Sequence, residues 1–308
     1  MSYRIDPRLP LTSEVQRIAA EEIGEALLYL AAARDNPDKA MHECRKRLKH
    51  LRALLRLVRS GDEAFVKAEN ARYREVSAKL AGPREAAALI ETLDRVAAEF
   101  PDEAMGGALE PVRDKLVARH AGVLNKDLAK AVDAAAASCR TGLSRLEKMN
   151  LPDHPEAAAD ILADSLRVTM RRARKALENA KDRGDPSDFH DLRKAVKAHA
   201  KHLTLLKKFW PSPVKPQLKA LDALGERLGE LHDIFVLHAL AEEEGRPLGS
   251  RAETRALNKL ARLSERKLRK TCLTEASELF RDGPKRSARK VARKIRRDMA
   301  EHEAAPAP

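Results

Sequence analysis

The segment His42-Glu43-Cys44-Arg45-Lys46-Arg47-Leu48-Lys49-His50-Leu51-Arg52-Ala53-Leu54-Leu55-Arg56 predicts an amphipathic helix with a cationic face. At about 100° per residue, one stripe is apolar and a second stripe, well away from its centre, is basic. The apolar stripe consists of Leu48, Leu51, Leu55 and Val58, with Cys44 beside it. The basic stripe consists of His42, Arg45, Lys49, Arg52 and Arg56. It extends about 21 Å, which suits successive charges of a linear polyanion.

The sign of this charge distinguishes the helix from an ordinary solvated face. Between His42 and Arg59 there is one acid, Glu43, against seven lysines and arginines. Solvated faces usually mix both signs, because opposite charges one turn apart stabilise a helix and like charges oppose it. A solvated face remains the ordinary alternative for any single helix of this kind, but an anionic ligand would explain the uncompensated repulsion.

The same pattern returns 148 residues later in the chain. His42, Arg45, Lys46 and Lys49 fall on His190, Arg193, Lys194 and Lys197, and the helix breaker at 36–38 falls on the one at 184–186. The second basic stripe also contains Lys201 and Lys208, and the preceding helix adds Arg167, Arg171, Arg174 and Lys175. The constant offset predicts a duplicated helical unit of roughly 145 residues, the size of one bundle.

The rest of the chain reads as helices separated by proline and glycine breaks, which predicts an all-α fold. Helices are expected at about 13–34, 39–59, 63–80, 84–99, 109–149, 157–182, 187–209, 215–244, 251–281 and 284–302. The predicted halves are residues 1–152 and 153–308. The C-terminal run 285–297 is strongly basic, and it could extend the same surface or form a loosely ordered tail.

Composition limits the classes of function. The 308 residues carry a formal charge of +13, which favours nucleic acid, an anionic surface or polymeric phosphate as a partner. Three dispersed cysteines form neither a metal-type pair nor a disulfide framework, and no signal peptide or membrane-spanning run is apparent. We therefore expect a cytoplasmic protein with no membrane association.

No motif in the sequence indicates catalysis. There is no glycine-rich phosphate loop, no repeated pair of nucleophile and base, and no acidic magnesium site, so a binding protein without a cofactor is favoured over an enzyme. His199 and His202 project toward the apolar face and are expected to be packed rather than to bind ligand. Glu85 and Asp233 are expected to orient basic side chains or to cap helices.

The motif His42-x-x-Arg45-x-x-x-Lys49-x-x-Arg52 and its second copy, His190-x-x-Arg193-x-x-x-Lys197, resemble the CHAD (conserved histidine α-helical domain) family over about residues 3–281. The segments 80–85 and 228–233 are similar to that family's second element. The resemblance implies two antiparallel four-helix bundles, related by pseudo-twofold symmetry around a basic groove. Ala200 and Lys201 depart from the usual Arg-Tyr pair, which removes a ligand contact at Ala200.

The resemblance also implies binding of inorganic polyphosphate in the groove, and association with polyphosphate granules and their proteins. The candidate binding residues are His42, Arg45, Lys46, Lys49, Arg52, Arg56, Arg171, Arg174, His190, Arg193, Lys194, Lys197 and Lys201. Nucleic acid is the main alternative ligand, although the first basic helix contains no aromatic platform for base stacking. An enzyme of phosphate metabolism that uses the motif histidines, or a scaffold for an acidic protein, also remains open.

Overall fold

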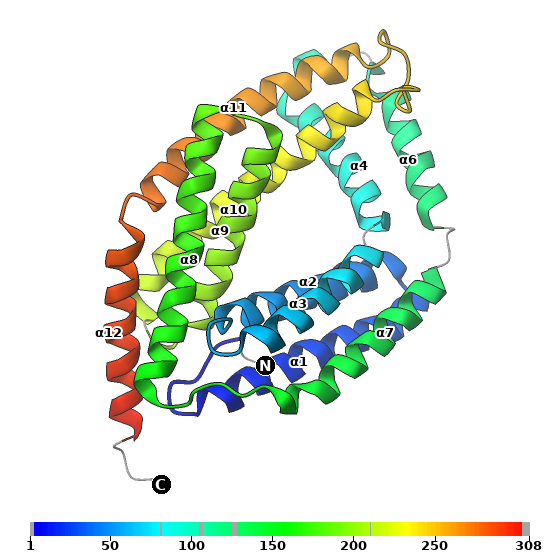
Figure 1. Ribbon diagram of the computed structural model, residues 1–308. Coiled ribbons are helices and arrows are strands. Elements are labelled where there is room, and N and C mark those ends of the chain that lie inside the picture. Colours follow the sequence, from blue (N-terminus) through cyan, green and yellow to red (C-terminus); the bar gives the residue numbers. More distant parts are fainter. Residues whose placement is uncertain (1–2, 81, 105–106, 125–127, 210, 304–308) are drawn as a thin grey trace.

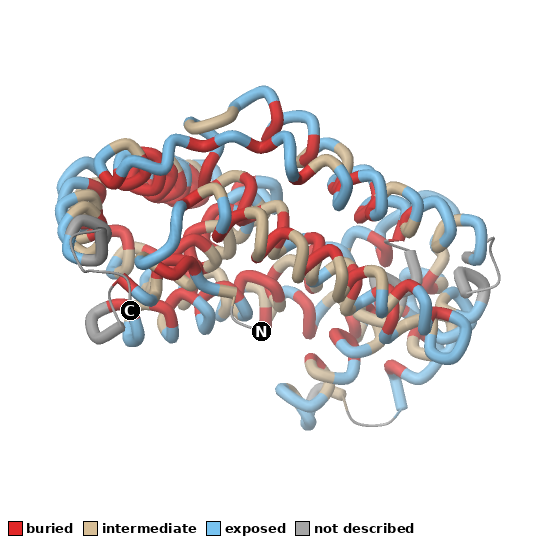
Figure 2. The backbone as a smooth tube through the Cα atoms, turned by 90° about the horizontal axis from the view of Figure 1, so that it is seen from below, coloured by how far each residue is buried: buried red, intermediate tan, exposed pale blue. Residues whose placement is uncertain are grey.

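The computed structural model describes residues 3–80, 82–104, 107–124, 128–209 and 211–303, and this part of the chain contains helices and no strand. The all-α prediction is confirmed. Buried and exposed residues alternate around the helices, as expected for amphipathic segments (Figure 2). None of the described helices is long and apolar enough to cross a membrane.

The first helices of the chain form the lower arm of a triangular frame (Figure 1). Its members are α1 (Leu11–Ala31), α2 (Pro37–Leu57), α3 (Glu63–Lys79) and α7 (Leu128–Arg145). Helix α2 packs on α1 and α3, and α7 packs on α1 and α3. The arm is therefore a four-helix bundle made entirely from the first half of the chain.

A second arm contains most of the remaining second-half helices. Its members are α8 (Pro155–Asp182), α9 (Pro186–Leu205), α12 (Pro284–Glu303) and the beginning of α10 (Pro211–Glu242). Helix α8 packs on α9 and α12, and α9 packs on α10. The basic C-terminal run is thus an ordered helix on the outside of α8, rather than a loose tail.

The third side of the frame combines both halves of the chain. It consists of α4 (Gly82–Glu99), α5 (Pro101–Ala104), α6 (Glu110–Leu124), α11 (Arg255–Leu279) and the later part of α10. Leu93 and Leu116 from the first half share a separate apolar core with Leu237 and Leu257 from the second. This core crosses the expected division at residue 152, because α4 packs on α10 and α11 while α6 packs on α4.

The offset of 148 residues relates similar elements, although the internal repeat and its symmetry stay predictions. It maps α2 onto α9 and the first residue of α3 onto the first residue of α10. The contacts α1–α2 and α2–α3 correspond to α8–α9 and α9–α10. The first half differs at one point, because α3 ends at Lys79 and α4 begins at Gly82 where α10 is continuous.

The single helix expected at 109–149 is two helices. Helix α6 ends at Leu124 and α7 begins at Leu128, and residues 125–127 lie outside the described part. Helix α6 packs on α4, whereas α7 packs on α1 and α3. The chain leaves one arm for another within this stretch, and helical periodicity gives no signal of such a change of partner.

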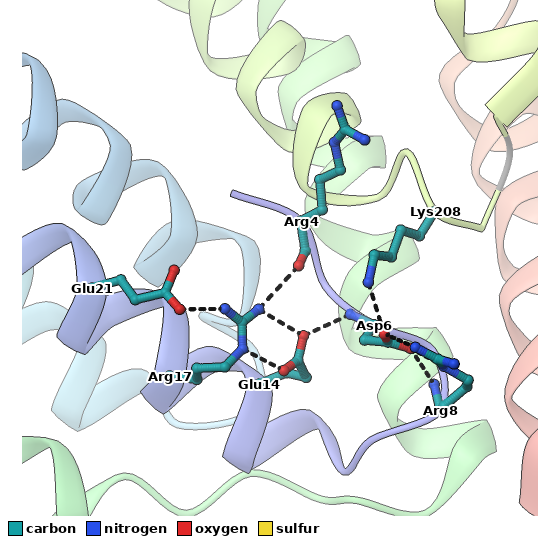
Figure 3. A network of polar contacts seen from close by, with 7 residues as sticks. All are labelled: Arg4, Asp6, Arg8, Glu14, Arg17, Glu21 and Lys208. Atoms are coloured by element: carbon teal, nitrogen blue, oxygen red, sulfur yellow. Dashed lines mark hydrogen bonds and ion pairs between the residues drawn. The ribbon is translucent and has the colours of Figure 1, made fainter. Parts of the chain in front are cut away.

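A polar network ties the N-terminal segment to both the first and second arms (Figure 3). The Ile5 backbone N–H donates to the Leu205 carbonyl over 2.8 Å. Asp6 accepts hydrogen bonds from Arg8 and, over 2.7 Å, from Lys208, while Glu14 accepts from the Asp6 backbone N–H. The hydrogen bond from Arg8, followed by that from Lys208, lowers the pKa of the Asp6 carboxyl despite its burial.

We predict that Asp6→Asn lowers the free energy of unfolding by about 2 kcal/mol at pH 7, since hydrogen bonds to charged groups contribute about that much. The folded-state pKa of Asp6 lies below its unfolded value, so this stabilisation is complete above about pH 4 and is lost as the pH falls further. Urea denaturation at pH 7 and pH 3 measures both effects. Glu63→Gln, which removes an exposed ion pair with Arg59, is the control and should change stability little; equal losses in the two variants would refute the prediction.

Candidate anion-binding cleft

Helix α2 is oriented by a capped start and a buried apolar stripe. Asn36 caps it by accepting a hydrogen bond from the Lys39 backbone N–H over 3.1 Å, and Pro37 occupies the first turn. Leu48, Leu51 and Leu55 are fully buried, as predicted. Their burial fixes the rotation of the helix and leaves the basic stripe facing away from the core.

Helix α9 is built in the same way. Pro186 starts the helix, and the apolar stripe that the sequence indicated is buried. That stripe consists of Phe189, Leu192, Val196, Leu203 and Leu206. Arg193, Lys197 and Lys201 are only half-buried, so their charged ends reach the surface of the same helix.

A cleft of about 1950 Å³ lies between α2 on one side and α8, α9 and α10 on the others, with contributions from α4 and α6. Fifteen lysines and arginines line it against seven aspartates and glutamates, so its surface is strongly cationic. The cations are Arg45, Lys46, Lys49, Arg52, Arg56, Arg59, Arg95, Arg119, Arg171, Arg172, Lys175, Arg193, Lys194, Lys197 and Lys201.

Most of the residues predicted to bind ligand line this cleft. The two predicted residues outside the lining are Arg174, which is half-buried elsewhere on α8, and His190. Lys208, placed on the same stripe by the sequence, is bonded to Asp6 instead. The binding role of each residue stays a prediction.

The acids of the cleft pair mainly with cations at its margins. Lys194 pairs with Asp191 at 2.6 Å and Lys197 with Glu226 at 2.9 Å, and these acids are largely exposed. Asp233 also lines the cleft, whereas the side chain of Glu85 lies outside the described residues. Among described residues, nine lining cations have no ion pair with a carboxylate: Arg52, Arg56, Arg95, Arg119, Arg171, Arg172, Lys175, Arg193 and Lys201.

Two of these unpaired cations are held in surroundings that disfavour their charge. Burial, followed by the charge of Arg52, lowers the pKa of Arg56 to about 10. Burial, followed by Lys197 and Lys49, lowers the pKa of Lys201 to about 8. Both groups would gain from a bound anion, because it restores the solvation that burial removes and offsets the repulsion of like charges.

His190 lies behind a second histidine that reaches the cleft. The rings of His190 and His232 are 4.7 Å apart between centroids, and His232 lines the cleft. Burial, followed by His232 and Lys194, lowers the pKa of His190, and burial followed by Arg193 lowers that of His232. The imidazole of His190 is thus biased toward its neutral form in the free protein.

His199 and His202 are packed between helices, as predicted, with 2% and 1% of their surface exposed. His202 Nε2 lies 3.1 Å from the Ala53 carbonyl of α2, to which it donates, and His199 Nδ1 lies 3.0 Å from the Thr169 hydroxyl. Burial lowers their pKa values to about 3 and about 4 respectively. Both imidazoles are therefore neutral at pH 7, and they join α2, α8 and α9 without adding charge.

Several lining cations were not identified from the sequence. Arg95 lies on α4 and Arg119 lies on α6, and neither helix has a repeated basic stripe. They reach the cleft only because α4 packs on α10 and α6 packs on α4. Arg172 follows Arg171 on α8, so the cationic first helix of the second half was the available signal. None of the described side chains of the C-terminal helix α12 lines the cleft.

Comparison with protein families identifies the chain. A family model described as CHAD domain matches residues 17–242, which is more than half of the sequence. The chain belongs to the CHAD domain family. The resemblance noted in the sequence is thereby confirmed, whereas a search of curated proteins finds no significant match.

Two solved structures share the fold of this CHAD domain. PptA from Streptomyces chartreusis superposes with a TM-score of 0.64 at 17% identity, covering 89% of this chain and 100% of that one. The CHAD domain from the plant Ricinus communis gives a TM-score of 0.60 at 18% identity, covering 90% and 94%. At such low identity these similarities establish the fold alone.

We predict that Lys201→Met stabilises the free protein by more than about 1 kcal/mol at pH 7, because it removes a buried charge whose pKa is depressed. Between about pH 8 and 10.5, Lys201 binds more protons in the unfolded chain than in the folded protein. The stability of the wild-type protein therefore rises with pH in this range, and the stability advantage of the variant disappears. Urea denaturation at pH 7 and pH 10.5 measures the difference. Lys194→Met is the matched control, since Lys194 is exposed and paired with Asp191; a gain equal to that of the control would contradict the prediction.

Proposed function

We propose that this CHAD domain binds inorganic polyphosphate in the cationic cleft and holds it without cleaving it. The observation that carries the proposal is the set of nine lining cations with no ion pair to a described carboxylate. Such a surface raises the local concentration of anions and binds them by releasing counterions. Membership of the CHAD family supports phosphate polymer as the anion.

The shape of the cleft supports a linear ligand. The basic stripe of α2 extends for about 21 Å, and cations of α8 and α9 line the same cleft. A phosphate polymer could contact cations from α2 and α9 along its length. Arginine can bind phosphoryl oxygens through two parallel hydrogen bonds, whereas lysine acts as a point charge.

Nucleic acid fits the cleft less well. Binding of single strands usually depends on aromatic side chains that stack on bases. Among the described residues that line the cleft, none is phenylalanine, tyrosine or tryptophan. The charges can therefore contact a phosphate backbone, but no such platform is provided for its bases.

Binding without hydrolysis is supported by the state of the cleft carboxylates. Asp191 and Glu226 pair with Lys194 and Lys197, which lowers their availability as general bases. In the described part of the chain, no three histidine, cysteine or acidic side chains group in a way that could hold a metal ion. Phosphate release from polyphosphate by the purified protein would contradict this part of the proposal.

Competition between ligands tests the proposed function directly. At physiological salt, long-chain polyphosphate should displace fluorescent polyphosphate at a far lower phosphate concentration than single- or double-stranded DNA. Arg193→Gln and Lys201→Met should each weaken binding about tenfold, because each removes one charge-assisted contact. Equal competition by DNA would instead favour the nucleic-acid alternative.

A control of equal charge separates the cleft from bulk electrostatics. Arg289 is exposed on α12 and does not line the cleft, so Arg289→Gln should leave affinity within about twofold. Association with polyphosphate granules would follow from the same binding, and tagged Arg193→Gln protein should lose it in cells. Equal weakening by the α12 variant would contradict a role for the cleft.

We also predict that binding tightens as the pH falls from about 8 to 6. The pKa of His232 is lowered in the free protein, and a bound phosphate raises it, so binding takes up a proton. Long chains are the suitable probe because few of their phosphates are titrating end groups. His232→Gln should flatten the profile near pH 6, while Lys201→Met should flatten it near pH 8; a flat wild-type profile would refute the prediction.

A further inference from the structure

Helix α11 carries a basic stripe with the same spacing as the stripe on α2. Arg255, Lys259, Arg262 and Arg266 follow one another at intervals of four, three and four residues. Arg45, Lys49, Arg52 and Arg56 have the same intervals on α2. The α11 stripe spans roughly 17 Å along one face of its helix.

This stripe lines a cleft of its own. The second cleft has a volume of about 620 Å³ and shares no lining residue with the cationic cleft described above. Its lining is Glu242, Arg251, Arg255, Asn258, Lys259, Arg262, Leu263 and Arg266. It lies along α11, the orange helix at the upper edge of Figure 1, and all of its lining residues except Glu242 lie beyond the residues matched by the family model.

The stripe cations are exposed and have no ion pair with a described carboxylate, although acids are close in sequence. Glu265 pairs with Arg269 at 2.8 Å, and Glu253 pairs with Lys115 of α6 at 3.1 Å. Glu242, the single acid of the lining, accepts a hydrogen bond from Asn258. An ordinary solvated face would use such acids to offset the repulsion along the helix, and this one does not.

The loop before α11 adds a fifth cation and is fixed in place. Gly249 has a φ of +114°, a backbone conformation that residues with a side chain rarely adopt. The Ser250 backbone N–H donates to Glu253 over 2.7 Å. This closed turn places Arg251 beside the stripe, which gives the second cleft a cationic side outside α11.

We propose that the α11 stripe is a second site for linear phosphate polymer, so that one molecule holds two polymer segments and cross-links them. The ligand class rests on the proposed function, because both stripes present cations at the same spacing. The existence of the second site rests on α11 alone. The protein is then a cross-linker of phosphate polymer as well as a binder.

Titration calorimetry with tripolyphosphate, a probe of only three phosphates, counts the sites separately. Wild-type protein should bind at two classes of site. Lys259→Glu combined with Arg262→Glu should lose one class, and Arg193→Gln combined with Lys201→Met should weaken the other. Long-chain polyphosphate should cause light scattering with wild-type protein, and either double variant should reduce it at least fivefold.

Arg289→Glu combined with Lys290→Glu is the control, because it makes the same charge change on exposed residues of α12.

Unchanged stoichiometry in the α11 variant would overturn the second site while leaving the proposed function intact. Unchanged binding in the cleft variant would overturn the proposed function instead. Equal losses in the α11 and α12 variants would overturn the second site, since bulk charge would then explain both. Tighter binding of single-stranded DNA than of polyphosphate by the cleft variant would overturn the ligand assignment for α11.

Discussion

The arrangement of this protein depends on how two strongly cationic helices are held beside one cleft. Helices α2 and α9 repel each other through their exposed faces, and their contact is stabilised by an uncharged buried layer. Leu48 and Leu51 bury the inner face of α2, while the Ala53 carbonyl accepts a hydrogen bond from His202 of α9. The Arg56 carbonyl accepts another from Ser165 of α8. Neutral hydrogen bonds and apolar packing thus oppose the repulsion between charges.

Histidine suits this layer because burial keeps it uncharged. With pKa values of about 3 and 4, His202 and His199 add polar contacts between helices without adding positive charge under the cleft. A lysine or arginine in place of His202 would put another cation beside Arg56, whose own pKa is already lowered. His232 has a different role, because it lines the cleft and can contact an anion that binds there.

The free protein is consequently less stable than its packing alone would allow. Half-buried Lys201 and Arg56 keep their charges near other cations, and a bound polyanion removes that penalty. Stability and ligand affinity should therefore respond in opposite directions to removal of these charges, which is a common feature of functional sites. The network around Asp6 has the opposite effect, because its cations Arg8 and Lys208 each meet the Asp6 carboxylate and contribute to the stability of the fold.

The sequence by itself determined most of the helices, their buried stripes and the basic stripes of α2 and α9, because helical periodicity is a local property. It also indicated the burial of His199 and His202, which lie close to the apolar face of their helix. Only the tertiary structure decided that α6 and α7 belong to different arms, that Arg95 and Arg119 reach the cleft, and that Lys208 pairs with Asp6. These outcomes depend on which distant helices pack together, and the pattern along a single helix fixes its own buried face without specifying the partner that covers it.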